Sequence, residues 1–300
     1  MPGLRRRNAP DKYEYLRDRH VLVVPTTVDP FDVDALVRTW FPAADLGSTG
    51  RAELLGAGVL SGPVSLSMED AVAADVATPW TVVYDLQVRP DRERRPPSRR
   101  PDGLHRAFPA GLPRGAELLG LEFLLGAARR LSGGVRPAGA AEMLLPDPAS
   151  AIDFRVVSPR WVRPADVATI ASQEGGEDVA ILSEGHLIGS AAVSHPDGAP
   201  FEVRLGLGPA GGVSVVARVA RTPEPAVAGE SFATAPTAIY DIRWQAPDPS
   251  WRFAESLEGV ALACRERARE PIESITRTLA ELGGGTVLDA DGFLIDRYLL

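Results

Sequence analysis

The stretch TVVYDLQV at residues 81–88 decides the fold, because a similar stretch, AIYDIRW, recurs at residues 238–244. Both stretches are rich in β-branched and aromatic residues, which is typical of strands. Both contain Tyr followed by Asp, as Tyr84-Asp85 and Tyr240-Asp241. Neighbouring side chains on a strand point to opposite faces, so one member of each pair faces the interior. The recurrence indicates that two halves of the chain are built alike.

The segments around each Tyr-Asp pair follow the same order. A strand comes first, at residues 20–24 and 154–157, and a helix opens near Pro30 and Pro164. Two short strands around glycines, the Tyr-Asp strand and a helix that stops at glycines follow in both halves. Identities recur in order if one residue is inserted in the later copy, and the matched pairs are Val23/Val156, Val24/Val157, Val28/Val162, Pro30/Pro164, Asp32/Asp166, Val33/Val167, Leu55/Leu182, Gly58/Gly185, Leu60/Leu187, Gly62/Gly189, Ser67/Ser194, Leu131/Leu282, Gly133/Gly284 and Gly134/Gly285. We interpret this pattern as an internal duplication.

These patterns predict an α+β fold of two similar halves, each a mainly antiparallel, ferredoxin-like sheet with helices on one face. We expect a pseudo-twofold axis between the halves, with the groove between them as the default ligand site. The predicted organisation is a basic N-terminal arm at residues 1–19, a first half at 20–148 and a second half at 152–300. An Arg- and Pro-rich loop at 89–115 is expected to be disordered, and a hairpin at 201–221 is expected as an insertion in the second half.

The composition narrows the class of protein. The formal net charge is -8, which argues against a nucleic-acid partner because an acidic protein repels phosphate backbones. Cys264 is the single cysteine, so no intrachain disulfide can form, and we predict a cytoplasmic location. No apolar run is long enough to cross a membrane, so no membrane partner is predicted. Lys12 is the single lysine among the 32 basic residues, a bias of GC-rich genomes that favours a bacterial source.

The sequence holds no motif for a cofactor or a metal. Gly206, Gly208 and Gly211 have the spacing of a dinucleotide-binding loop, but a strand pattern follows where that loop requires a helix. We therefore predict a hairpin turn there. The histidines are too far apart in sequence to form a helical ligand pair. No cofactor and no metal site are predicted.

Candidate site residues fall into two groups. Tyr240, Asp241 and His195 are the candidates for acid or base chemistry, because a buried Asp often has a shifted pKa and His titrates near neutrality. The candidates for binding are Tyr84, Asp85, Arg94, Arg95, Arg99 and Arg100, with the four arginines as an accessory contact in the loop at 89–115. The simpler interpretation of both Tyr-Asp pairs is structural, with Tyr packed in a core and Asp at the solvent.

The lack of catalytic motifs favours a non-enzymatic protein-binding or assembly protein that has a protein partner. Self-association is left open. The alternative is a small-molecule enzyme of unrecognised class, with its site in the groove between the halves and with Tyr240, Asp241 or His195 as acid or base.

Overall fold

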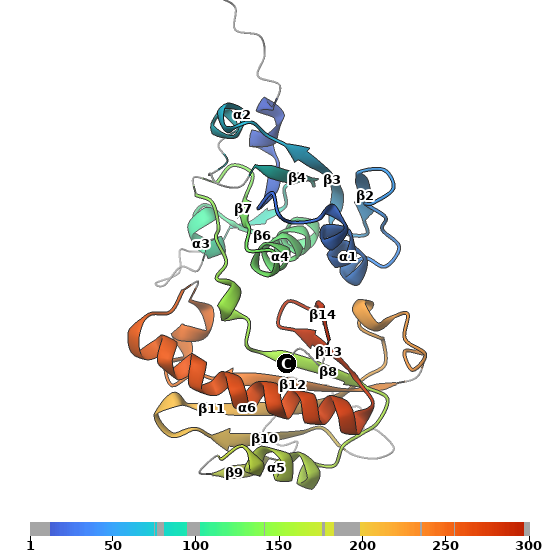
Figure 1. Cartoon of the computed structure of the whole chain (residues 1–300), viewed down its shortest axis with the longest axis vertical. Coiled ribbons are helices and arrows are strands. Elements are labelled where there is room, and N and C mark those ends of the chain that lie inside the picture. The colour runs from blue at the N-terminus through green and yellow to red at the C-terminus, as the bar shows by residue number, and fades with distance from the viewer. Residues whose placement is uncertain are drawn as a thin grey trace, which may run out of the picture. The chain divides into compact units, whose positions relative to one another are not determined.

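The computed structural model of the chain describes residues 13–74, 76, 81–94, 103–140, 142–175, 178–182, 199–234, 236–254 and 256–296. The chain divides into two compact units. Unit 1 contains Met1–Val37 and Ala43–Pro148, and unit 2 contains Arg38–Pro42 and Ala149–Leu300. Both units combine helices with antiparallel sheets, so the prediction of an α+β fold is confirmed (Figure 1). No helix in the described part of the chain has the length and apolar character needed to cross a membrane.

Unit 1 is built on a sheet with the strand order β2-β3-β4-β1-β7, in which all neighbours are antiparallel. A short ladder, β5 with β6, lies outside this sheet. The elements of unit 1 are η1 (Glu14–Asp18), β1 (His20–Val24), α1 (Pro30–Trp40), β2 (Arg51–Leu54), β3 (Gly58–Ser65), α2 (Met68–Ala73), β4 (Val82–Gln87), β5 (Arg92–Glu93), α3 (Gly103–Ala107), β6 (Leu112–Pro113), α4 (Gly115–Arg130) and β7 (Gly134–Arg136).

Apolar residues cover both faces of the unit 1 sheet. Helix α4 packs on one face, where Gly120 lets the helix approach the side chain of Leu86. On the opposite face, Leu16 of η1 and Ala71 of α2 pack against the β1 and β4 residues Val21 and Val83. The prediction of helices on one face is therefore wrong for unit 1, because its strands carry buried side chains on both sides. In each unit we call the side packed by the long helix the helix face, and the opposite side the second face.

Unit 2 is built on a longer antiparallel sheet with the order β14-β13-β8-β12-β11-β10-β9. Its elements are η2 (Pro148–Ser150), β8 (Phe154–Ser158), α5 (Pro164–Gln173), β9 (Val179–Leu182), β10 (Phe201–Gly206), η4 (Gly208–Ala210), β11 (Gly212–Ala220), η5 (Pro225–Val227), β12 (Thr237–Gln245), η6 (Pro249–Phe253), α6 (Gly259–Gly283), β13 (Thr286–Asp289) and β14 (Leu294–Ile295).

The helix face of the unit 2 sheet carries its main core. Helix α6 lies across this face (Figure 1), and its residues Ile272 and Ile275 belong to one buried cluster with Val156 and Tyr240 of the sheet. On the second face, Val227 of η5 covers Val157 and Leu288 in a much smaller cluster. The remainder of that second face is rich in charged residues. Apolar burial thus stabilises one side of this sheet far more than the other.

The two units share an order of elements around their first strand. In unit 1, β1 lies between β4, which ends an antiparallel meander, and β7, which follows α4. In unit 2, β8 lies in the same way between β12 and β13, which follows α6. The ladders place Leu22 opposite Tyr84 and Val156 opposite Tyr240. Leu22 and Val156 therefore hold the same position relative to the Tyr-Asp strand, whereas the sequence comparison paired Val23 with Val156.

Two predicted segments differ from expectation. The loop at 89–115 is not wholly irregular, because its described parts contain β5, α3 and β6 and bury Ala107 and Phe108. The predicted N-terminal arm ends too late, because Tyr13 and Leu16 are buried against the unit 1 sheet. Both errors arise because a few apolar residues anchor segments whose overall composition is polar. The predicted hairpin at 201–221 is formed by β10 and β11, which turn through η4.

Candidate functional site

The two Tyr-Asp pairs occupy the same place in their units. Tyr84-Asp85 lies in β4 and Tyr240-Asp241 in β12, and each of these strands pairs with the first strand of its sheet. Tyr84 and Tyr240 are fully buried on the helix faces, whereas Asp85 and Asp241 lie on the second faces. Tyr240 and Asp241 therefore point away from each other and do not form one acid–base pair.

The two tyrosine hydroxyls have different partners. Tyr240 Oη accepts from the backbone N–H of Val162 at 2.5 Å and donates to the Arg160 carbonyl at 3.3 Å. Tyr84 Oη is buried and has no hydrogen-bond partner within the described residues. Val28, matched in sequence with Val162, donates its N–H to the Pro25 carbonyl instead.

Burial raises the pKa of both tyrosines to about 12, with the charge of Asp29 adding to the effect on Tyr84. Both hydroxyls therefore stay protonated at neutral pH. In this state they can donate a hydrogen bond but cannot act as a base.

Asp85 in unit 1 has a simple environment. Its Oδ2 accepts from Arg19 Nη1 at 2.5 Å, and Arg19 follows η1 directly. The carboxylate is buried while the guanidinium is 29% exposed. The contact ties η1 to the second face and leaves no excess of charge.

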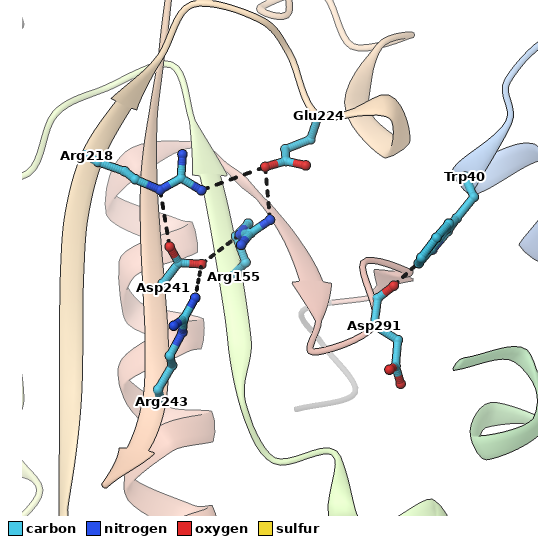
Figure 2. Close-up of polar contacts among 7 residues, drawn as sticks. All are labelled: Trp40, Arg155, Arg218, Glu224, Asp241, Arg243 and Asp291. Atoms are coloured by element: carbon cyan, nitrogen blue, oxygen red, sulfur yellow. Dashed lines mark hydrogen bonds and ion pairs between the residues drawn. The ribbon is translucent and has the colours of Figure 1, made fainter. Parts of the chain in front are cut away.

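Three arginines surround the buried Asp241 carboxylate in unit 2 (Figure 2). Arg155 Nε donates to Asp241 Oδ1 at 2.7 Å, and Arg218 Nε donates to Oδ2 at 3.3 Å. Arg243 Nη2 lies 3.5 Å from Oδ1. Arg155 Nη1 also donates to Glu224 Oε1 at 2.9 Å, and Arg218 Nη2 lies 3.9 Å from that oxygen. We call these five residues the arginine cluster.

The electrostatics hold the arginine cluster in its ionised form. Burial alone would raise the pKa of Asp241, but Arg155, and then Arg218 and Arg243, outweigh it and lower the pKa below its ordinary value. Burial acts to lower the pKa of Arg155, but Asp241 and then Glu224 outweigh it and raise the pKa. Asp241 is consequently a stable anion at neutral pH, which suits an ion-pair role and not a proton-transfer role.

A second acid–arginine group extends this surface across the sheet. Glu202 of β10 accepts from Arg204 Nε at 2.7 Å and Nη2 at 3.1 Å, and from Ser214 Oγ at 2.6 Å. Burial would raise the pKa of Glu202, but the hydrogen bonds of Arg204 and Ser214 lower it. The half-buried Val216 lies opposite both Glu202 and Asp241 in the ladders. The arginine cluster together with Glu202, Arg204 and Ser214 is called the arginine face below.

The arginine face is layered. The side chains of Glu202 and Asp241 are each 8% exposed, whereas the four guanidinium-bearing side chains range from 28% to 58%. Buried carboxylates therefore fix the orientation of arginines that meet the solvent. A surface of this kind can bind an anion through N–H donors that are already positioned.

Figure 2 also shows a structural contact at the end of α1. The last helical residues belong to the Arg38–Pro42 segment of unit 2. Trp40 Nε1 donates to the Asp291 carbonyl at 2.9 Å, and its ring centroid lies 5.9 Å from that of Phe293. Asp289 fixes the turn between β13 and β14 by accepting from the N–H groups of Asp291 and Phe293.

Unit 1 contains a buried cluster that the sequence did not indicate. Glu117, in the first turn of α4, is fully buried and accepts from Arg92 Nε at 3.1 Å and Nη2 at 3.0 Å. Its other oxygen accepts from the backbone N–H of Asp91 at 2.8 Å. His20 Nε2 lies 3.3 Å from Glu117 Oε1. Because these residues are distant in sequence, their types and spacing carry no signal that joins them.

The protonation of His20 follows from its neighbours. His20 Nδ1 accepts from the backbone N–H of Ala138 at 3.0 Å, so the proton lies on Nε2 and points to Glu117. Burial lowers the pKa of His20 to about 4, although Glu117 opposes this effect. The imidazole is therefore neutral at physiological pH. An open depression of about 340 Å³ is lined by residues that include Glu93 and Leu118, which are sequence neighbours of Arg92 and Glu117.

The remaining candidates are only partly described. Arg94 is exposed, and Arg95, Arg99, Arg100 and His195 lie outside the described residues. Within the residues that the structure describes, no group of three or more His, Cys, Asp or Glu side chains could hold a metal ion.

The arginine face and the buried His20–Glu117 cluster are polar arrangements that the fold assembles from residues distant in sequence. No family model, curated protein or solved structure matches this chain.

Proposed function

We propose that the chain is a non-enzymatic protein-binding or assembly protein and that the arginine face of unit 2 contacts its partner. The observation that carries this proposal is the layering of that face, in which buried carboxylates orient half-exposed guanidinium groups. Arginine is enriched at protein interfaces because its planar group makes several directed hydrogen bonds at once. Pre-positioned arginines also lose less side-chain entropy on binding.

The electrostatics favour binding over catalysis at this face. An acid–base catalyst needs a pKa near the working pH, but the arginines move the pKa of Asp241 away from neutrality. Tyr240, the other candidate of the same dipeptide, lies on the opposite side of the sheet. Ion pairing is thus the chemistry that the residues of this face support.

The arginines of the loop at 89–115 are proposed as an accessory contact. Arg94 is exposed, and Arg95, Arg99 and Arg100 follow it closely in sequence. Deleting this loop would be a poor test because the helix α3 and strand β6 lie within it. Changing these four arginines to Gln tests the contact without removing those elements, and unchanged partner binding would count against it. We also propose a cytoplasmic location on the basis of the single cysteine.

We further propose that the two units arose by duplication of a ferredoxin-like unit. The register that pairs Leu22 with Val156 gives the same sequence separation as the matches Val28/Val162, Pro30/Pro164 and Val33/Val167. The one-residue insertion assumed from the sequence is then unnecessary. The matched residues of the two units are thus the same distance apart in sequence through a strand, a turn and the start of a helix, which supports a common origin.

The ends of the long helices support the same proposal. Gly133 donates its N–H to the Ala128 carbonyl, and Gly285 donates to the Ala280 carbonyl, both at 2.8 Å. A Cβ atom on Gly133 would meet the Val23 carbonyl oxygen at 2.3 Å, and one on Gly285 would meet that of Val157 at 2.7 Å. The two glycines thus make the same close approach to corresponding first strands. This geometry pairs Gly133 with Gly285, one residue beyond the match made from sequence.

The binding function is tested by affinity capture with charge-reversed variants. The wild-type chain, the Arg218→Glu/Arg243→Glu variant and the control Arg160→Glu/Arg163→Glu would be used to capture proteins from the cells that make the chain. We expect discrete proteins to be retained by the wild type and the control and lost from the cluster variant. Equal capture by all three chains, or no enriched protein with the wild type, would count against the proposal.

A small-molecule enzyme remains the second candidate because of one observation in unit 1. The neutral His20 and the Glu117 carboxylate form a buried pair, and the open depression is lined by Leu118, the residue that follows Glu117 in α4. This candidate moves the acid–base role from Tyr240, Asp241 and His195 to His20 and Glu117. A metabolite library incubated with the wild type and with His20→Gln provides its test. Turnover that both chains support equally would exclude the assignment.

A further inference from the structure

We infer that the arginine face binds the carboxylate side chains of an acidic peptide segment on the partner protein. This inference rests on the proposed protein-binding function and adds the chemistry of the partner. Two features of the face support it. One is a carboxylate that reaches the arginines from outside the sheet, and the other is a set of arginine N–H donors that remain accessible to solvent.

Glu224 is the carboxylate that reaches the arginines from outside the sheet. It precedes η5 and belongs to the connection between β11 and β12. Its Oε1 accepts from Arg155 at 2.9 Å and lies 3.9 Å from Arg218 (Figure 2). The chain therefore places an acidic side chain, carried on irregular backbone, against arginines of two strands. A partner's Asp or Glu would repeat this contact on the adjacent arginines.

Arg243 and Arg204 provide those adjacent positions. Within the described residues, Arg243 contacts Asp241 alone, at 3.5 Å, and its side chain is 39% exposed. Arg204 is 58% exposed and uses Nε and Nη2 for Glu202. Each guanidinium carries five N–H donors, so both retain donors toward the solvent. The two residues lie on either side of Ser214 in the ladders, in one row across three strands.

The charge balance favours an acidic peptide over a nucleic acid. The four arginines are opposed by Glu202, Glu224 and Asp241, which leaves an excess of one positive charge on the face. A nucleic-acid backbone would bring many regularly spaced charges against these buried acids and would gain little counterion release. The described residues of the second face of β10, β11, β12 and β8 include no aromatic side chain for stacking on bases. A few spaced carboxylates match the arginine donors better.

Unit 1 lacks this capacity at the corresponding positions. Val21 stands opposite Asp85, where Arg155 stands opposite Asp241. Gln87 follows Asp85 by two residues, as Arg243 follows Asp241. The specialised surface therefore belongs to unit 2.

Fluorescence anisotropy with a short labelled peptide of alternating Glu and Gly tests the inference on the full chain. The matched Gln–Gly peptide controls for charge. The variant Arg204→Gln/Arg243→Gln removes the two positions with free donors and leaves Arg155 and Arg218 paired with Asp241. Arg160→Gln/Arg163→Gln is the control on the other side of the sheet. We expect the Arg204→Gln/Arg243→Gln variant to raise the Kd for the Glu peptide by about tenfold or more, because the charged hydrogen bonds of both arginines to the peptide are lost. The control should leave the Kd unchanged.

Three results would overturn the inference. They are equal Glu-peptide affinity in the two double variants, equal affinity of the wild type for the Gln peptide, and stronger competition by a single-stranded oligonucleotide than by unlabelled Glu peptide. Sedimentation velocity tests for a second copy of the chain as the partner. Dimers that form with the wild type and not with the arginine variant would mean that the chain binds itself, and the inference of a separate partner protein would be wrong. If the chain captures a partner protein but does not bind the Glu peptide, this inference is wrong and the proposed function stands. If the chain binds the peptide but captures no protein, the proposed function is wrong.

Discussion

The two units treat the second faces of their sheets differently. In unit 1 that face is mainly apolar, and η1 and α2 cover it with Leu16 and Ala71. Among the described residues of unit 2 a small part of the face is covered, around Val227, and the face also carries arginines with exposures up to 58%. An apolar face must be buried, whereas a charged face can meet water or a partner. Two antiparallel sheets thus carry one internal apolar surface and one charged surface that meets the solvent.

The Asp of each Tyr-Asp pair shows how the difference arises. Asp85 is neutralised by one arginine, Arg19, which follows η1, and the pair closes the unit 1 face. Asp241 is opposed by three arginines from its own sheet, so positive charge remains at the solvent. The tyrosines remain in the cores of both units. An Asp at the same place in the two sheets therefore acquires its role from the residues across the ladder.

The largest expected effect is on unit 1 and follows from Glu117→Ala. The change removes the acceptor of Arg92, of His20 and of the Asp91 N–H in a fully buried place. We expect a loss of about 3–5 kcal/mol in the stability of unit 1, because the Asp91 N–H, the His20 ring N–H and the partly exposed Arg92 guanidinium would all lose their acceptor. Hydrogen exchange followed by mass spectrometry reports the two units separately. Glu122→Ala, an exposed site on the same helix, is the control, and equal exchange in both variants would contradict the buried cluster.

Acidification provides the next effect, also in unit 1. His20 has a pKa of about 4 in the folded chain and an ordinary value of 6.5 when unfolded. The unfolded state therefore binds a proton first, and stability falls as the pH drops from about 6.5 towards about 4, by about 3 kcal/mol at most. Urea unfolding of the wild type and His20→Gln between about pH 7 and about pH 5 measures this. If the free energy of unfolding of the wild type fell with decreasing pH no more steeply than that of the variant, the lowered pKa of His20 would be refuted.

The same substitution at Asp85 and at Asp241 compares the second faces of the two units directly. Asp241→Ala leaves three arginines close together, and we expect a loss of about 3 kcal/mol. Asp85→Ala frees a single Arg19 that can turn to the solvent, and we expect about 1 kcal/mol. Chemical denaturation of both variants gives the two losses. If Asp85→Ala were the more damaging, the contrast between the two faces would be wrong.

The smallest expected effect compares the two tyrosines. Tyr240→Phe leaves the buried N–H of Val162 without its acceptor and should cost about 1–2 kcal/mol. Tyr84→Phe removes a hydroxyl that has no partner within the described residues and should change stability by less than about 0.5 kcal/mol. Thermal unfolding of the two variants is sufficient. Equal losses would show that Tyr84 has a partner of comparable strength.

The sequence predicted the strands that contain Tyr84 and Tyr240 because the β-branched residues around them carry a strong local signal. Strand register was harder to predict, since the run of valines in β1 permits more than one alignment and only the ladders show that Leu22 lies opposite Tyr84 and Val156 opposite Tyr240. The coverage of both unit 1 faces was missed because η1 is short and polar apart from Leu16. Local pattern therefore predicted the strands but not which surfaces they bury.

The candidate site was predicted only through Asp241. Its partners Arg155, Arg218 and Arg243 come from three strands, and only pairing of those strands brings them together. Glu224 lies in an irregular connection that has no periodic signal. Sites assembled from distant strands depend on topology and register, which a residue pattern does not encode.

The most direct test places a photo-crosslinking amino acid at two matched positions. Val216 lies opposite Asp241 and Ser61 lies opposite Asp85, and both residues are half-buried on the second face of their sheet. In cells that make the chain, we predict a discrete protein adduct from position 216 that disappears when Arg218 and Arg243 are changed to Glu, and none from position 61. An adduct of equal yield from position 61, or none from position 216, would contradict the assignment of the binding surface to unit 2.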